Sequence, residues 1–118
     1  MKTEMSSLTV GREFQLWEYR VSHGMLLIRS PQSETHAQNC DVTFAGVQYV
    51  ALPRHLGSIS IAEERSPEQL IALGMLLGRE PYSSDKVFVV RALSNNFIVI
   101  AANCMIRLTD HDLFETGF

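Results

Sequence analysis

Alternating apolar and polar positions in the first half of the chain predict short β-strands. Strand-forming residues are dense over Glu13 to Val21, but their alternation changes phase near Leu16. A change of phase indicates either a β-bulge or burial of both faces, and we favour the bulge. Ser22-His23-Gly24 predicts a tight hairpin turn, in which Gly24 adopts positive φ, so Met25 to Arg29 should return as the second strand.

A polar stretch then interrupts the strand pattern. Ser30 to Asn39 contains no large apolar residue, which predicts a surface loop. A third strand is expected from Cys40 to Leu52, and the phase of its apolar residues switches at Gly46, which indicates a bulge or bend. A short fourth strand should cover Ser58 to Ala62.

The next segment carries the signals of one helix. Ser66 is a suitable N-cap, Pro67 suits the first helical position, Gln69 completes a capping box, and Gly78 supplies the stop. The predicted sheet-facing stripe consists of Leu70, Leu73 and Leu77, widened by Ile71, Met75 and Leu76. Gly74 inside the helix suggests a close approach to the sheet.

Two strands are predicted after the helix, over Lys86 to Leu93 and Phe97 to Leu108. Ser94-Asn95-Asn96 should join them, because asparagine tolerates the left-handed conformation of a hairpin turn. Their continuous apolar runs predict central strands with both faces covered. The sequence thus predicts a single α+β domain over residues 1–118. It should be a bent, mostly antiparallel sheet of about six strands, in the order β-β-β-β-α-β-β, with one helix packed on it; a half-open barrel is the alternative.

Composition narrows the class of protein. The 118 residues are 46% apolar and 19% charged, as expected of one globular domain. A net charge of −3 disfavours nucleic acid and anionic lipid as partners and favours a basic protein. No apolar run approaches the roughly 20 residues of a membrane span, and the first ten residues lack the apolar core of a secretory signal. We therefore expect a cytoplasmic protein with no membrane partner.

Candidate chemistry is sparse. Cys40 and Cys104 lie in apolar surroundings, so we expect reduced, buried thiols, with a bridge between them as the alternative. Together with His36 and His111 they lack the spacing of a structural zinc site. The glycines form no phosphate-binding motif, and neither thiol lies in the turn that exposes a nucleophile. We therefore expect no cofactor, no metal and no enzymatic activity.

Charged and aromatic residues on the strands have simple structural interpretations. The strand arginines Arg20, Arg29, Arg91 and Arg107 are interpreted as cross-strand partners of Glu13, Glu18 or Asp41, not as nucleic-acid ligands. Trp17, Tyr19 and Val21 share a phase that is either buried by the bulge or exposed as a protein-contact surface.

The leading hypothesis for function is a non-enzymatic, intracellular protein-binding domain. The size and acidic charge are similar to those of small immunity proteins of bacterial toxin systems, which occlude a toxin's active site. The predicted contact residues are Trp17, Tyr19, Glu34, His36, Asp110, Asp112 and Glu115. One alternative is a small-ligand pocket or modest enzyme between sheet and helix, with polar groups from His23, Tyr49, His55 and Arg91. Another is a homodimer through an edge strand or the Trp17 surface.

Overall fold

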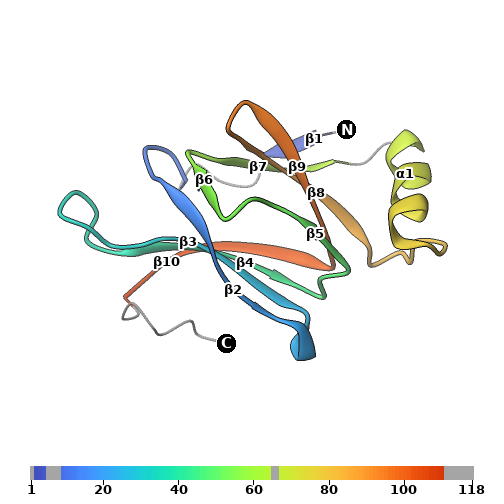
Figure 1. The fold of residues 1–118 in the computed structure, drawn as a ribbon, viewed down its shortest axis with the longest axis horizontal. Helices are drawn as coiled ribbons and strands as arrows, with labels where there is room; N and C mark the ends of the chain where they lie inside the picture. The colour runs from blue at the N-terminus through green and yellow to red at the C-terminus, as the bar shows by residue number, and fades with distance from the viewer. Residues whose placement is uncertain (1, 5–8, 65–66, 111–118) are drawn as a thin grey trace.

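The computed structural model describes residues 2–4, 9–64 and 67–110, and this part of the chain forms two five-stranded antiparallel sheets and one α-helix (Figure 1). The elements are β1 (Lys2–Glu4), β2 (Phe14–Arg20), a 3-10 turn η1 (Val21–His23), β3 (Met25–Ser30), β4 (Asn39–Ala45), β5 (Tyr49–Ala51), β6 (His55–Gly57), β7 (Ser60–Glu64), α1 (Pro67–Leu77), β8 (Lys86–Ala92), β9 (Asn95–Ala101) and β10 (Asn103–Thr109). Sheet A has the order β1-β7-β8-β9-β5, and sheet B has the order β10-β4-β3-β2-β6.

The two sheets share one apolar core. Side chains from both, including Phe44 of sheet B and Phe88 of sheet A, bury against one another, and these two rings meet edge to face at 5.5 Å. On the other face of sheet A, Leu73 of α1 packs against Val87 and Ile100. The central strands β8 and β9 are therefore covered on both sides, which confirms the prediction from their apolar runs.

The α+β class, with mostly antiparallel strands and one helix on a sheet, is confirmed, but the single sheet of about six strands is wrong. The predicted strand from Cys40 to Leu52 is two strands, β4 in sheet B and β5 in sheet A. The predicted strand from Phe97 to Leu108 likewise divides into β9 and β10, one in each sheet. The strand order therefore differs from the prediction, and the half-open barrel stays untested.

The two points where these strands change sheet touch each other. Gly46 has φ +65°, and a Cβ placed on it would lie 2.8 Å from the Cβ of Ala102. The Ala102 N–H donates to the Ala45 carbonyl at 2.9 Å. The bend predicted at Gly46 is therefore confirmed, but nothing local in the sequence marks Ala102, because alanine is compatible with a continuing strand.

Other strand boundaries also differ between the prediction and the structure. The predicted strand from Ser58 to Ala62 is β7, Ser60–Glu64, and Gly57, expected in a turn, ends β6. The sequence pattern did not predict β1 or β6 as strands. Strands of three residues are too short to display an alternating pattern, so only their partners reveal them.

The first hairpin follows its prediction closely. The pairing of β2 with β3 shifts register between Leu16 and Glu18, which makes Trp17 the extra residue of a bulge. Gly24 adopts the left-handed conformation at φ 58° after η1. Both the bulge and the positive φ at Gly24 are therefore confirmed, whereas Val21, predicted as the end of the strand, is the first residue of η1.

The β8–β9 hairpin is confirmed, but its turn is not where the asparagines are. Ala92 pairs with Asn95, which leaves Leu93 and Ser94 as the two turn residues, at φ 53° and 62°. The Asn95 side chain instead donates to the Leu93 carbonyl at 3.1 Å. The extended apolar pairing of β8 with β9 sets the register and overrides the local preference of asparagine.

Helix α1 begins at Pro67 and ends before Gly78, whose N–H donates to the Gly74 carbonyl at 2.9 Å and whose φ is 70°. Ser66 and the side chains of Gln69 and Leu70 lie outside the described residues. With 11 residues, α1 is too short to cross a bilayer, and the described part of the chain has no helix that could.

The predicted width of the helical stripe is wrong. Leu73 is buried and Leu77 half-buried, whereas the widening residues Ile71, Met75 and Leu76 are exposed. Gly74 faces Arg79 and Pro81, not the sheet. The segment after α1 therefore folds back beside Gly74, and among the described helix side chains Leu73 and Leu77 pack against sheet A.

Candidate functional site

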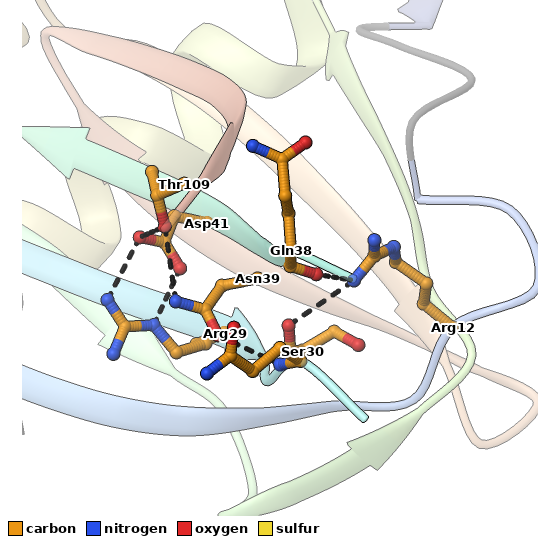
Figure 2. A network of polar contacts seen from close by, with 8 residues as sticks. Arg12, Arg29, Ser30, Gln38, Asn39, Asp41 and Thr109 are labelled. Carbon is orange, nitrogen blue, oxygen red and sulfur yellow. Dashed lines mark hydrogen bonds and ion pairs between the residues drawn. The ribbon is translucent and has the colours of Figure 1, made fainter. Parts of the chain in front are cut away.

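A buried ion pair lies at the centre of a polar network in sheet B (Figure 2). Arg29 of β3 and Asp41 of β4 are cross-strand partners, and both are almost fully buried. The Arg29 Nε and Nη2 donate to the two carboxylate oxygens of Asp41 at 2.7 and 3.0 Å. This pair agrees with the prediction that strand arginines are cross-strand partners of Glu13, Glu18 or Asp41, which did not say which arginine pairs with which carboxylate. By contrast, Arg20 pairs with Glu18 on its own strand.

Hydrogen bonds extend this network to β10 and to the β3–β4 loop. Thr109 Oγ1 donates to Asp41 at 2.9 Å, and Asn39 Nδ2 donates to Thr109 Oγ1 at 3.3 Å. The carbonyl oxygen of the Asn39 side chain accepts from the backbone of Gln32 at 2.8 Å. The network therefore fixes the base of the loop to two strands of sheet B.

The bulge residue Trp17 contributes to the same face. Its ring centroid lies 5.3 Å from the Arg29 Cζ, a cation–π arrangement, and its side chain is half-buried. Tyr19 is 45% exposed and Val21 is exposed in η1. The bulge thus buries part of the predicted aromatic surface and leaves the rest open to solvent.

The β3–β4 loop is held by Arg12, which precedes β2 (Figure 2). Arg12 Nη1 donates to the carbonyls of Gln38 and Ser30, at 3.0 and 3.4 Å. His36 Nε2 donates to the Gly11 carbonyl at 3.2 Å, so this nitrogen carries a proton. The same segment therefore anchors the loop at both its middle and its end.

Among the predicted contact residues, the structure brings His36 and Asp110 to this loop, since Gln38 Nε2 donates to Asp110 at 3.2 Å. Glu34 lies exposed on the same loop, where Ser33 N–H donates to the His36 carbonyl. Trp17 and Tyr19 belong to β2 of sheet B. Asp112 and Glu115 lie outside the described residues.

A pocket of about 240 Å³ opens between this loop and the segment that precedes β2. It is lined by Gly11, Arg12, Glu13, Ser30, Pro31, Ser33, Thr35 and His36. Sequence reasoning found the loop and His36 but missed Arg12, which belongs to a short irregular segment with no periodic pattern. An arginine that must reach across to the loop gives no local signal.

The two cysteines lie apart on adjacent strands. Cys40 is opposite Leu108 and Cys104 is opposite Phe44, so the thiols are four positions apart along the β4–β10 pair, too far for a disulfide. Both are free thiols. Burial raises the pKa of Cys40 above 9.0 and that of Cys104 to about 12, which disfavours the thiolate at neutral pH.

The two histidines considered as metal ligands, His36 and His111, do not complete a site with the two cysteines. His36 donates to Gly11, and His111 lies outside the described residues. Within residues 2–4, 9–64 and 67–110, no three His, Cys, Asp or Glu side chains gather as a metal site would require.

The polar residues of the alternative ligand pocket are dispersed over the molecule. His23 contacts Ser22 in η1, and His55 is exposed in β6. Tyr49 packs into the helix–sheet cluster, whereas Arg91 contacts Asn96 beside the β8–β9 turn. At the helix–sheet contact itself lie buried apolar side chains from α1, β8 and β9.

Helix α1 lies at the end of the long axis opposite the β3–β4 loop (Figure 1), and three of its apolar side chains are exposed to solvent. Ile71 and Met75 lie one helical turn apart and are 71% and 81% exposed, and Leu76 is exposed beside them. We call these three residues the α1 apolar surface. The segment that follows is ordered by Arg79, which lies over the Tyr82 ring at 4.0 Å and donates to Asp85 at 2.9 Å.

No protein-family model, curated protein or solved structure matches this chain.

Proposed function

We propose that this chain is a non-enzymatic protein-binding domain that uses the α1 apolar surface as its main contact. The observation that carries this proposal is the exposure of Ile71 and Met75 on a helix whose opposite side is already packed on sheet A. Exposed apolar side chains at i and i+4 are what an amphipathic helix offers to a partner's apolar groove.

The contact would be energetically useful. Complete burial of one large apolar side chain contributes roughly 1.5–3 kcal/mol, and neither Ile71 nor Met75 has yet gained this from folding. The α1 backbone is already helical, so binding would order few additional residues. These features support a partner with a preformed apolar groove.

The overall charge bears on the partner's chemistry. A net charge of −3 favours a partner with a positive surface around its groove. Occlusion of the active site of a toxin, in the manner of an immunity protein, is the narrower form of this proposal. In that case the purified partner would be an enzyme that this chain inhibits at a ratio of one to one.

The test is affinity capture from cells of the source organism, followed by reconstitution from purified components. Wild type and Met75→Glu are compared, with Val10→Glu as the matched control because Val10 is 74% exposed but lies outside α1. We expect a stoichiometric protein that binds wild type and the control and binds the Met75→Glu variant at least tenfold more weakly. Equal binding by all three chains would contradict the proposal.

Light scattering at tens of micromolar distinguishes a second copy of this chain from a different partner. A monomer mass of 13.3 kDa is expected. A dimer that Met75→Glu dissociates would assign the α1 apolar surface to self-association and overturn the proposal of a different protein. A variant at Tyr19, Tyr19→Glu, tests the rival contact surface on β2.

A further inference from the structure

Two arginines are buried near the β3–β4 loop, and they differ in how their charge is balanced. Arg29 has the carboxylate of Asp41. Arg12 is only 7% exposed, yet its hydrogen bonds go to two neutral carbonyls. Among the described residues, no carboxylate forms an ion pair with it.

A cation in this position is costly unless an anion approaches it. Removing a guanidinium from water incurs a large desolvation penalty, which carbonyl dipoles offset only in part. The loop carbonyls accept from Nη1 of Arg12. The N–H groups on Nε and Nη2 therefore remain available to donate to a bound anion. Arg12 also lines the pocket of about 240 Å³, so an anion can reach its guanidinium from solvent.

The other walls of the pocket add hydrogen-bond donors. Ser33 and Thr35 are exposed residues of this lining, and their hydroxyls are hydrogen-bonded to each other at 3.1 Å. One of the two hydroxyls donates in that bond, so the other O–H is available to an anion. His36, held by its bond to Gly11, is a third polar wall. Glu13 is the acidic residue of this lining, and it is exposed.

We propose that this pocket is a binding site for a small oxyanion, a phosphate or carboxylate group, with Arg12 as its principal ligand. The planar guanidinium matches both groups, and hydroxyl donors complete their shells. The volume is below the roughly 300–1,000 Å³ of pockets that enclose drug-sized ligands, so it suits one such group. This site is independent of the α1 apolar surface.

The experiment is a titration of the ¹⁵N-labelled chain with inorganic phosphate and, separately, with acetate, at constant pH and ionic strength with chloride as the reference. We expect saturable shifts of the Arg12, Ser33 and His36 amides with at least one of the two anions. Saturation by phosphate alone indicates a phosphate ligand, and saturation by acetate indicates a carboxylate such as an acidic side chain. Absence of saturable shifts with either anion would overturn the proposal.

Variants of the lining residues show which side chains bind the anion. Ser33→Ala and Thr35→Ala should each weaken binding by about threefold to tenfold, the loss of one hydrogen bond. Glu13→Gln should tighten it by about threefold, because it removes a repelling charge. Ser83→Ala, an exposed serine outside the pocket lining, is the matched control and should bind like wild type.

Arg12→Gln should abolish saturation, while Met75→Glu should leave it unchanged. Because Arg12 also anchors the loop, folding of its variant must be checked by its spectrum. If the Arg12→Gln variant unfolds, the affinities of the Glu13→Gln and Ser33→Ala variants decide whether the anion binds in this pocket. Affinity that is the same in wild type, Glu13→Gln and Ser33→Ala would place the anion elsewhere and refute the site.

Discussion

At the scale of single residues, the polar side chains in and beside sheet B matter most. Asp41 is buried and receives three hydrogen bonds, two from Arg29 and one from Thr109. Such a network orders its members only when every partner is present, because a buried charge without its counterion is strongly destabilising. The Arg29 Nη1 is a buried donor that finds no hydrogen-bond acceptor among the described residues, so Arg29 already bears part of this cost.

Asp41→Asn should therefore destabilise the fold by about 3 kcal/mol, because it leaves the Arg29 charge buried and uncompensated. Urea unfolding followed by Trp17 fluorescence measures the change. Thr109→Val, which removes the hydrogen bond to Asp41 and the one from Asn39 but leaves the ion pair intact, should cost less, about 2 kcal/mol. The double variant Arg29→Met with Asp41→Leu should be more stable than Asp41→Asn, because it removes both buried charges. A double variant that is less stable than Asp41→Asn would show that the ion pair itself stabilises the fold beyond the neutralisation of the two charges.

A second carboxylate makes stability depend on pH. Burial raises the pKa of Asp85, but hydrogen bonds from Arg79 and from the Tyr82 backbone outweigh it, so the pKa lies below its ordinary value of 3.8. A lowered folded-state pKa contributes stability that is fully present above the unfolded pKa and is lost as pH falls through the folded one.

Asp85→Asn should accordingly be less stable than wild type at pH 7, and the difference should shrink as pH falls below about 4. Chemical denaturation at pH 7, 5 and 3 measures it. Asp110→Asn is the control, since its carboxylate is exposed and accepts from the Gln38 side chain on the surface. A difference that is constant over this range would show that Asp85 acts through packing and not through its charge.

At the scale of elements, the β8–β9 hairpin shows pairing overruling turn preference. Leu93 and Ser94 adopt positive φ, although glycine and asparagine suit these positions far better. The apolar strands on either side align Val90 with Phe97 and Val89 with Ile98, and this register leaves only two residues for the loop.

Replacing Leu93-Ser94 by Asn-Gly should therefore stabilise the protein by about 1 kcal/mol, because both residues accept the left-handed conformation. Thermal and urea unfolding measure the gain. The Leu93→Ala, Ser94→Ala variant removes the same side chains without relieving the backbone and should show no such gain. Equal gains in both variants would attribute the effect to loss of the exposed Leu93 side chain.

At the scale of the whole molecule, the chain passes between its two sheets where Gly46 meets Ala102. These residues follow β4 and β9, which belong to different sheets, and their contact fixes how the two layers meet. Positive φ and close approach both require glycine at position 46.

Gly46→Ala should destabilise the protein by about 3 kcal/mol, from backbone strain of roughly 1–2 kcal/mol and overpacking against Ala102 of similar size. Gly57→Ala is a matched control, because Gly57 also has φ +65° but nothing lies within 4 Å of its Cβ position. Gly57→Ala should lose only the stability that corresponds to backbone strain. Equal losses in the two variants would mean that the Gly46–Ala102 approach is not tight in solution.

The sequence alone was sufficient for features with local causes. The bulge beside Leu16, the glycine turn at Gly24 and the glycine stop of α1 each depend on a few neighbouring residues. Cross-strand pairing of strand arginines with Glu13, Glu18 or Asp41 was also predicted, because these residues of opposite charge lie on predicted strands, but only the structure selects Arg29 as the ion-pair partner of Asp41. The same holds for the two-sided burial of β8 and β9, since a continuous apolar run has no polar face to expose.

Only the tertiary structure decided the features that depend on distant partners. An unbroken apolar run predicts burial, but it does not say that β9 and β10 bury against different sheets. Leucine, isoleucine and methionine are equally apolar on either side of α1, so the contact with sheet A decides that Leu73 is buried and Met75 is not. The predicted hairpin of β2 with β3 already brings residues 11–13 beside residues 30–36. The Arg12 pocket itself depends on how the β3–β4 loop lies against residues 11–13, through the hydrogen bonds of Arg12 and His36, and no local pattern marks these contacts.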